Sequence, residues 1–87
     1  MNWFCYLLQC ADGTLYCGIT NDLERRLAAH NAGTASKYTR TRLPVELMFA
    51  EPCADRSAAS KREMEIKSLP RTEKLALIRL TATPENQ

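Results

Sequence analysis

Apolar segments separated by turn residues divide the chain into short elements, beginning with two strands. Residues 3–10 are aromatic and apolar, the sequence Ala11-Asp12-Gly13 follows, and residues 14–20 are again rich in strand-forming side chains. Aromatic and β-branched residues on both sides of a glycine-containing turn are typical of a β-hairpin. The pattern therefore predicts a hairpin over residues 3–20.

The turn also sets the pairing of the hairpin, and with it the position of two tyrosines. A three-residue loop with Gly13 in the left-handed conformation pairs Tyr6 with Gly18 and Leu8 with Tyr16. The two tyrosines then lie diagonally on one face of the sheet, and the glycine leaves space beside the phenol ring of Tyr6. A two-residue loop would shift the pairing by one residue and separate the tyrosines onto opposite faces.

A helix is predicted after the hairpin, beginning near Asp22 with Asn21 or Thr20 as its cap. Four residues at helical spacing share its inward stripe: Leu23, Arg26, Leu27 and His30. An arginine among leucines needs an anionic partner or a hydrated cleft, because its charge is costly to bury alone. Arg26 is therefore a candidate functional residue, whereas a lone histidine in a helix is as readily structural.

The rest of the chain predicts one more strand and two helices. The strand covers residues 45–50, and the helices cover residues 56–69 and about 71–80. The order β-β-α-β-α-α describes a small α+β domain, in which helices flank a three-stranded sheet. So short a chain has room for one core, so residues 1–82 are expected to form a single domain and residues 83–87 a frayed tail.

Cysteine usage and hydropathy limit the class of protein. Four cysteines without a CxxC spacing, together with a single histidine, favour reduced thiols over a disulfide framework or a zinc site. No apolar segment reaches the roughly 18 residues that a membrane span requires, and the N-terminus has no basic region before a long apolar segment. We expect a cytoplasmic protein that does not bind membranes.

The charge distribution tells more than the net charge of +2. The segment Lys37-Tyr38-Thr39-Arg40-Thr41-Arg42 holds three bases and an aromatic ring but no acid. Such a segment suits the phosphate backbone of a nucleic acid, and the alternative is a solvated loop.

Several polar residues at predicted inward positions suggest a site: Tyr6, Tyr16, Arg26, His30 and one glutamate of the 56–69 helix. Phosphodiester cleavage needs a cation for the developing charge, a base for water, and a metal ion held by hard oxygen ligands. Helical spacing does not choose between Glu63 and Glu65 as the carboxylate. Two tyrosines in a hairpin are also common packing residues.

These residues, in this order, resemble the GIY-YIG nuclease domain. The likeness is carried first by Phe4-Cys5-Tyr6, Tyr16-Cys17-Gly18, the segment Ile19 to Leu27, and His30. Lys37-Tyr38-Thr39, Leu43-Pro44 and the segment Ala59 to Lys67 are similar to the small stand-alone branch of that family. Phe4, Cys5 and Cys17 replace the glycine and isoleucines of the two family tripeptides.

The resemblance implies a DNA endonuclease that hydrolyses phosphodiester bonds with Mg²⁺ or Mn²⁺. It implies catalytic roles for Tyr6, Tyr16, Arg26, His30 and Glu63, with Glu63 as the metal ligand. We favour Tyr6 as the base, which requires that Arg26 or the metal complex acidify a phenol whose ordinary pKa is about 10.

The expected substrate is DNA, preferably single-stranded, because a small module with aromatic side chains suits stacking on unpaired bases. The expected substrate-binding residues are Lys37, Tyr38, Arg40, Arg42 and Lys67, and no obligatory protein partner is expected. Two alternatives stay open: a non-catalytic module that binds nucleic acid, and a nuclease that acts on branched or duplex DNA in repair or recombination.

Overall fold

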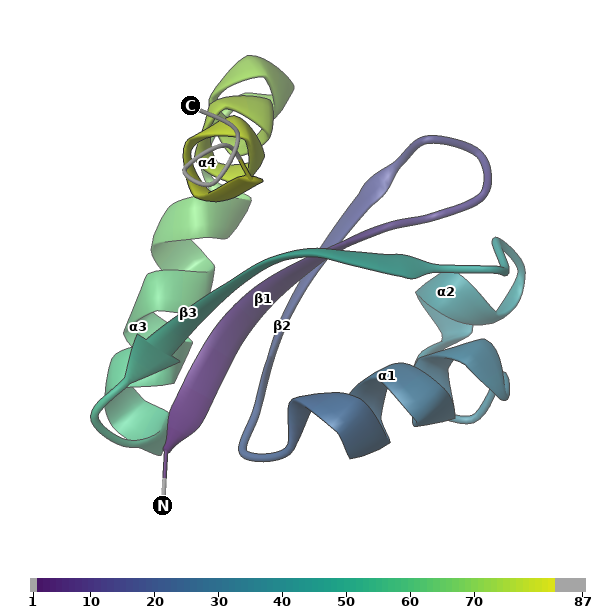
Figure 1. Ribbon diagram of the computed structural model, residues 1–87, viewed down its shortest axis with the longest axis horizontal. Helices are drawn as coiled ribbons and strands as arrows, with labels where there is room; N and C mark the ends of the chain where they lie inside the picture. Colours follow the sequence, from purple (N-terminus) through teal and green to yellow (C-terminus); the bar gives the residue numbers. More distant parts are fainter. Residues whose placement is uncertain (1, 83–87) are drawn as a thin grey trace.

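Three antiparallel strands form one sheet with helices on both faces in the computed structural model, which describes residues 2–82 (Figure 1). The elements are β1 (Trp3–Gln9), β2 (Leu15–Thr20), α1 (Leu23–Asn31), α2 (Lys37–Arg40), β3 (Glu46–Cys53), α3 (Arg56–Lys67) and α4 (Arg71–Ala82). The predicted α+β class and the order of the principal elements are confirmed, and α2 is an additional short helix within the basic connection. The expected tail, residues 83–87, lies outside the described residues.

The strand order is β2-β1-β3, so β1 is the central strand. Four consecutive residues of β1, from Cys5 to Leu8, are buried. A strand that is covered on both faces carries apolar or otherwise satisfied residues at every position instead of alternating with polar ones. None of the described helices is long and apolar enough to cross a membrane.

The hairpin has the register that a three-residue loop predicts. Gly13 has a φ of 86°, and Tyr6 pairs with Gly18 while Leu8 pairs with Tyr16. Gly18 is required by a close approach: a Cβ atom built there would lie 2.6 Å from the hydroxyl oxygen of Tyr6. The glycine therefore allows the phenol ring to lie against the backbone of β2.

The cap of α1 differs from the prediction by one or two residues. Asp22, and not Asn21 or Thr20, caps the helix, because its carboxylate accepts a hydrogen bond from the backbone N–H of Arg25 at 3.1 Å. Thr20 instead accepts a hydrogen bond from the N–H of Asp22 at 3.1 Å, which orders the turn between β2 and α1. A carboxylate at this position also complements the positive end of the helix dipole.

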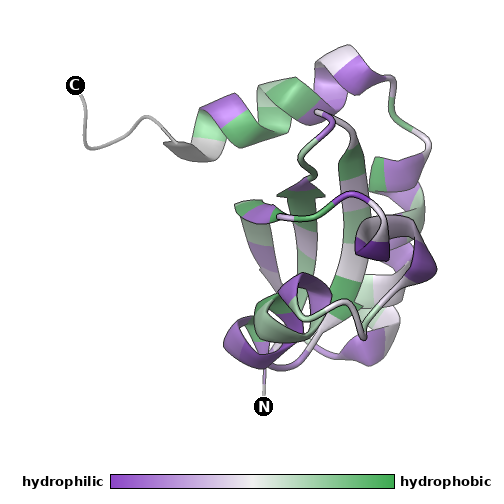
Figure 2. Ribbon diagram, turned by 90° about the vertical axis from the view of Figure 1, so that its right-hand side faces the viewer, coloured by the Kyte–Doolittle hydropathy of each residue, from purple (hydrophilic) through white to green (hydrophobic). Residues whose placement is uncertain are grey.

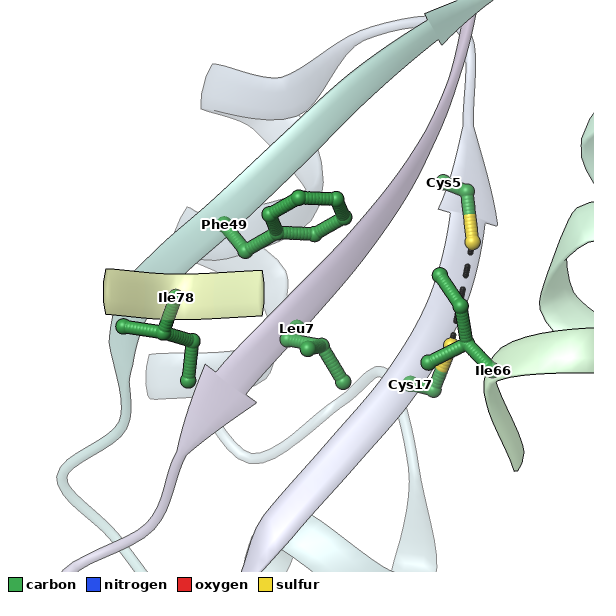
Figure 3. Close-up of a cluster of buried hydrophobic side chains, with 6 residues drawn as sticks. All are labelled: Cys5, Leu7, Cys17, Phe49, Ile66 and Ile78. Atoms are coloured by element: carbon green, nitrogen blue, oxygen red, sulfur yellow. Dashed lines mark hydrogen bonds between the residues drawn. The ribbon is translucent and has the colours of Figure 1, made fainter. Parts of the chain in front are cut away.

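The sheet separates two clusters of different character. On the face covered by α3 and α4, an apolar cluster joins six buried side chains, and Figure 3 shows them: Cys5, Leu7, Cys17, Phe49, Ile66 and Ile78. The thiols of Cys5 and Cys17 lie 3.8 Å apart, and neither forms a disulfide. The strands carry many hydrophobic residues in Figure 2, whereas hydrophobic and hydrophilic residues alternate along the helices.

The other face is covered by α1, and the polar residues of interest lie there. Its cluster contains Tyr6, Leu8, Cys10 and Val45, with Leu23 and Leu27 of α1 packed against them. The predicted inward stripe of α1 therefore does face the sheet. This second face, and not the apolar core, holds the candidate site.

Candidate active site

Tyr6 lies at the centre of the site, in the middle of β1. Its side chain is only 2% exposed. The ring of Tyr16 lies 6.5 Å from the Tyr6 ring, centroid to centroid, and 5.1 Å from the ring of His30. The three rings form one cluster, which confirms that the two tyrosines share a face of the sheet.

Arg26 projects from α1 towards the Tyr6 hydroxyl. Its Nε–H donates a hydrogen bond to that oxygen at 3.4 Å, and this contact raises the pKa of the guanidinium. A cleft of about 560 Å³ adjoins it, lined by Thr20, Asn21, Asp22, Arg25, Arg26 and Ala29. The sequence required an anionic partner or a hydrated cleft for this arginine, and the structure provides the cleft.

His30 is fully buried at the end of α1 and contacts two hydroxyl groups. Its Nε2 lies 3.0 Å from the Tyr6 oxygen, and its Nδ1 lies 2.8 Å from the Oγ1 of Thr39. Burial, and secondly the positive charge of Arg26, lower the pKa of His30 below its usual value. The imidazole is therefore neutral at pH 7, with one nitrogen able to donate and the other able to accept.

Tyr6 is not acidified by its neighbours in this structure. Burial raises the pKa of its phenol, and the hydrogen bond and charge of Arg26 lower it by a smaller amount. Arg26 alone therefore does not bring the pKa of Tyr6 below its ordinary value, because desolvation of a phenolate outweighs the contact with one half-exposed cation, and the metal complex is the other expected source of acidification. Tyr6 is a neutral hydroxyl at pH 7.

Two residues of the basic segment contact the ring cluster. The ring of Tyr38 stacks on that of Tyr16 with centroids 5.9 Å apart, and the guanidinium of Arg42 lies 4.1 Å above the Tyr38 ring. Arg42 also pairs with Asp12 at 3.1 Å, so part of its charge is already compensated. Lys37 and Arg40, the other predicted substrate-binding residues of this segment, are exposed to solvent.

A second cleft extends the first one around the end of β2. Its volume is about 370 Å³, and it is lined by Trp3, Ile19, Thr20, Asn21, Arg26 and Arg56. The two clefts share Thr20, Asn21 and Arg26. Their lining includes three arginines, Arg25, Arg26 and Arg56, beside the acid Asp22, and the sequence pattern singled out neither Arg25 nor Arg56.

Glu63 and Lys67 are on α3, which covers the opposite face of the sheet. The two side chains form an ion pair at 3.3 Å, and Glu63 is the less exposed of the two. No hydrogen bond or ion pair within residues 2–82 joins Glu63 to Tyr6, Arg26 or His30. The structure thus brings together four of the predicted catalytic residues and leaves the fifth on another helix.

The donor chemistry of Glu63 nevertheless suits a hard divalent cation. Mg²⁺ commonly keeps several waters and needs only one or two carboxylates when substrate phosphate supplies further oxygens. Within the described chain, no group of three or more His, Cys, Asp or Glu side chains is arranged to hold a metal ion. Glu65, the other candidate, is more exposed than Glu63 and pairs with Arg62 at 3.0 Å.

Comparison with known proteins identifies the arrangement. Residues 2–76 match the model of the GIY-YIG catalytic domain. The chain belongs to the GIY-YIG family. The tyrosines of its two motif tripeptides, Tyr6 and Tyr16, are therefore those whose rings meet on one face of the hairpin.

Similar proteins match most of the length of the chain. A UPF0213 protein of Desulfotalea psychrophila is 53% identical over 78 residues, which are 88% of this chain and 71% of the relative. The solution structure of a UPF0213 protein from Bacillus halodurans is 38% identical, with a TM-score of 0.61 over 98% of this chain and 90% of that one. A protein from E. faecalis is also 38% identical, with a TM-score of 0.63 over 93% and 86% of the two chains.

GIY-YIG membership gives the site a chemical context, because the family is one of nuclease domains that use divalent metal ions. Thr39, which contacts His30 of the ring cluster, is another residue that sequence reasoning missed. It lies in a segment that was interpreted as a basic connection, and the available signal was Ser36, which caps α2 by accepting a hydrogen bond from the N–H of Tyr38 at 3.1 Å.

Proposed function

We propose that this GIY-YIG protein is a metal-dependent DNA endonuclease that hydrolyses phosphodiester bonds. One observation carries the proposal: the buried hydroxyl of Tyr6 contacts both Arg26 and His30 beside an arginine-lined cleft. Hydrolysis of a phosphodiester needs a cation near the phosphate and a group that takes a proton from water. The three side chains supply both functions within one cluster.

Arg26 is the residue that stabilises charge in this mechanism. Its Nε–H contacts Tyr6, and its guanidinium lines the adjoining cleft, where it can bind the non-bridging oxygens of a phosphate. A guanidinium matches two phosphate oxygens at once, and its attraction increases as negative charge builds up in the transition state.

Tyr6 and His30 act together as the base. The phenol oxygen takes a proton from the attacking water while the phenol passes its own proton to the neutral Nε2 of His30. The water oxygen then bonds to phosphorus, the bond to the leaving oxygen breaks, and solvent protonates the leaving group. A phenol with a raised pKa is suited to such a concerted transfer because it never carries a full charge.

Glu63 is the proposed ligand of Mg²⁺ or Mn²⁺. The metal supplies Lewis-acid polarisation of a phosphate oxygen when bound. Glu63 lies across the sheet from Arg26 and lines neither cleft, so its role as metal ligand rests on the family resemblance. Lys67 pairs with Glu63 and is exposed, so it can attract the phosphate backbone of DNA that approaches α3.

Single-stranded DNA is the substrate that the surface suits best. Tyr38 is exposed, and its ring lies between that of Tyr16 and the guanidinium of Arg42, which an unpaired base can displace in order to stack on the ring. The exposed side chains of Lys37 and Arg40, and that of Arg42, lie in the same segment and can contact phosphates. A cytoplasmic location, predicted from the sequence, belongs to this proposal.

The test is cleavage of labelled single-stranded, duplex and branched oligonucleotides, with Mg²⁺ or Mn²⁺ or with a chelator. We expect metal-dependent cutting that is fastest on single strands, lost in Glu63→Gln and retained in the matched control Glu65→Gln. Equal cutting of all three substrates would contradict the single-strand preference, and faster cutting of branched or duplex DNA would favour a role in repair or recombination. Binding without metal-dependent cutting would overturn the nuclease proposal and favour a non-catalytic binding module.

A further inference from the structure

Hydrogen bonds continue past the proposed catalytic group into the short helix α2. They run from Arg26 to Tyr6 at 3.4 Å, from Tyr6 to His30 at 3.0 Å, and from His30 to Thr39 at 2.8 Å. The hydroxyl of Thr39 in turn donates to the backbone carbonyl of Ser36 at 3.4 Å. This series of hydrogen bonds joins three elements, β1, α1 and α2, and the residues in its middle are buried.

The donor and acceptor of each hydrogen bond can be assigned from Arg26 onwards. A guanidinium only donates, so the Tyr6 oxygen accepts from the Nε–H of Arg26. The phenol proton then needs an acceptor, since a buried donor without a partner is costly. Nε2 of His30 is the contact that offers one, and it must therefore be unprotonated.

The contacts of Thr39 fit the same direction. Its hydroxyl can donate to the backbone carbonyl of Ser36, which only accepts. The oxygen of Thr39 is then free to accept from a proton on Nδ1 of His30. The contacts of Tyr6 require the tautomer of His30 that carries its proton on Nδ1, and those of Thr39 accommodate it.

We propose that Thr39 is a positioning residue that holds His30 in the Nδ1–H tautomer, with Nε2 ready to accept the proton of Tyr6. Its catalytic consequence rests on the nuclease function proposed above. In the other tautomer Nε2 would carry a proton, and His30 could not take one from Tyr6 without first losing its own. A partner on the second ring nitrogen is a common way of fixing the tautomer of a functional histidine.

Burial makes the hydroxyl of Thr39, and not its methyl group, the decisive feature. Thr39 and His30 are both 0% exposed, and every buried polar side-chain atom among residues 2–80 has a hydrogen-bond partner. Valine has nearly the same shape as threonine but cannot accept the proton of Nδ1. Serine keeps the acceptor and gives up the methyl group.

Nuclear magnetic resonance tests the tautomer directly, because His30 is the single histidine of the chain. Protein labelled with ¹⁵N-histidine gives one imidazole, whose two nitrogens show separately whether each is protonated. We expect the Nδ1–H tautomer in the wild type and in Thr39→Ser, and a shift towards the Nε2–H tautomer in Thr39→Val. A wild type in the Nε2–H form, or a Thr39→Val variant that keeps the Nδ1–H form, would overturn the proposal.

Kinetics then separate positioning from folding. We expect Thr39→Val to lower kcat for single-stranded DNA by roughly tenfold to a hundredfold with little change in KM, and Thr39→Ser to restore most of it. Equal loss in both variants would show that Thr39 acts by packing and would overturn the proposal. The tautomer spectra need no catalysis, so an inactive wild type with the expected tautomers would contradict the nuclease function and leave the assignment of Thr39 intact.

Discussion

Gly18 offers a sharp test of the idea that the position of Tyr6 controls the chemistry. In Gly18→Ala the new Cβ would lie 2.6 Å from the Tyr6 hydroxyl oxygen and 2.7 Å from the carbon that bears it. Ordinary contact requires about 3.5 Å, so the phenol must move by about 1 Å. The ring is 2% exposed and packs against Tyr16 and His30, so it has little room to move without disturbing the site.

The expected magnitudes come from this displacement. A movement of about 1 Å breaks the 3.0 Å contact with His30 and the 3.4 Å contact with Arg26. Misplacement on this scale costs on the order of a hundredfold in rate. Overpacking costs about 1–3 kcal/mol of the free energy of unfolding, from which the lower entropy of an unfolded alanine recovers roughly 0.4–1 kcal/mol.

Gly13→Ala is the matched control. A Cβ at Gly13 meets nothing within 4 Å, but the φ of 86° is strained for alanine, so a stability loss of about 1–2 kcal/mol is expected far from the phenol. Urea unfolding followed by the fluorescence of Trp3, the single tryptophan, compares the two variants. Cleavage of single-stranded DNA is then measured where both are folded. If Gly18→Ala cuts as fast as Gly13→Ala, the position of the Tyr6 hydroxyl does not control the reaction.

Three further results are expected from the same site. Arg26→Lys keeps the charge but loses the Nε–H and the paired donors, so kcat should fall by about a hundredfold in steady-state assays, and an unchanged kcat would exclude Arg26 from transition-state stabilisation. Because burial and then Arg26 lower the pKa of His30, the unfolded state binds a proton more readily, and the free energy of unfolding should fall as the pH decreases below about 6.5. Denaturation at several pH values should show a weaker fall in His30→Gln, and identical slopes would contradict this linkage. Tyr38→Leu removes the ring between Tyr16 and Arg42, so fluorescence anisotropy should show single-stranded DNA bound about 1–2 kcal/mol more weakly, whereas unchanged affinity would exclude stacking there.

The hairpin and its tyrosines could be predicted from the sequence because their geometry is local. The loop ending at Gly13 sets the register, and the register alone decides that Tyr6 and Tyr16 share a face. The inward stripe of α1 was predictable for the same reason, since helical spacing places Arg26 and His30 on one side. Only the cap was misplaced, because neighbouring polar residues can each accept the first free N–H groups.

The rest of the site depends on contacts between distant parts of the chain. Thr39 meets His30 only because α2, a helix of four residues, folds against the end of α1, and so short a helix shows no hydrophobic period. The raised pKa of Tyr6 depends on coverage by α1, which no local pattern measures. Glu63 could be chosen over Glu65 by family resemblance but not by spacing, and its place across the sheet from Arg26 follows from packing.

The side chains of β1 alternate between the two faces of the sheet, so the strand contributes both to the apolar core and to the candidate site. Cys5 and Leu7 face the apolar core under α3 and α4. Tyr6 and Leu8 face α1, on the side of the sheet that holds the hydrogen-bonded residues of the site. Substitutions at the odd positions should therefore change the melting temperature with little effect on turnover, and those at the even positions should change turnover first. Thermal stability can accordingly be adjusted by substitutions on one face of a single strand, while the face that holds the candidate site stays unchanged.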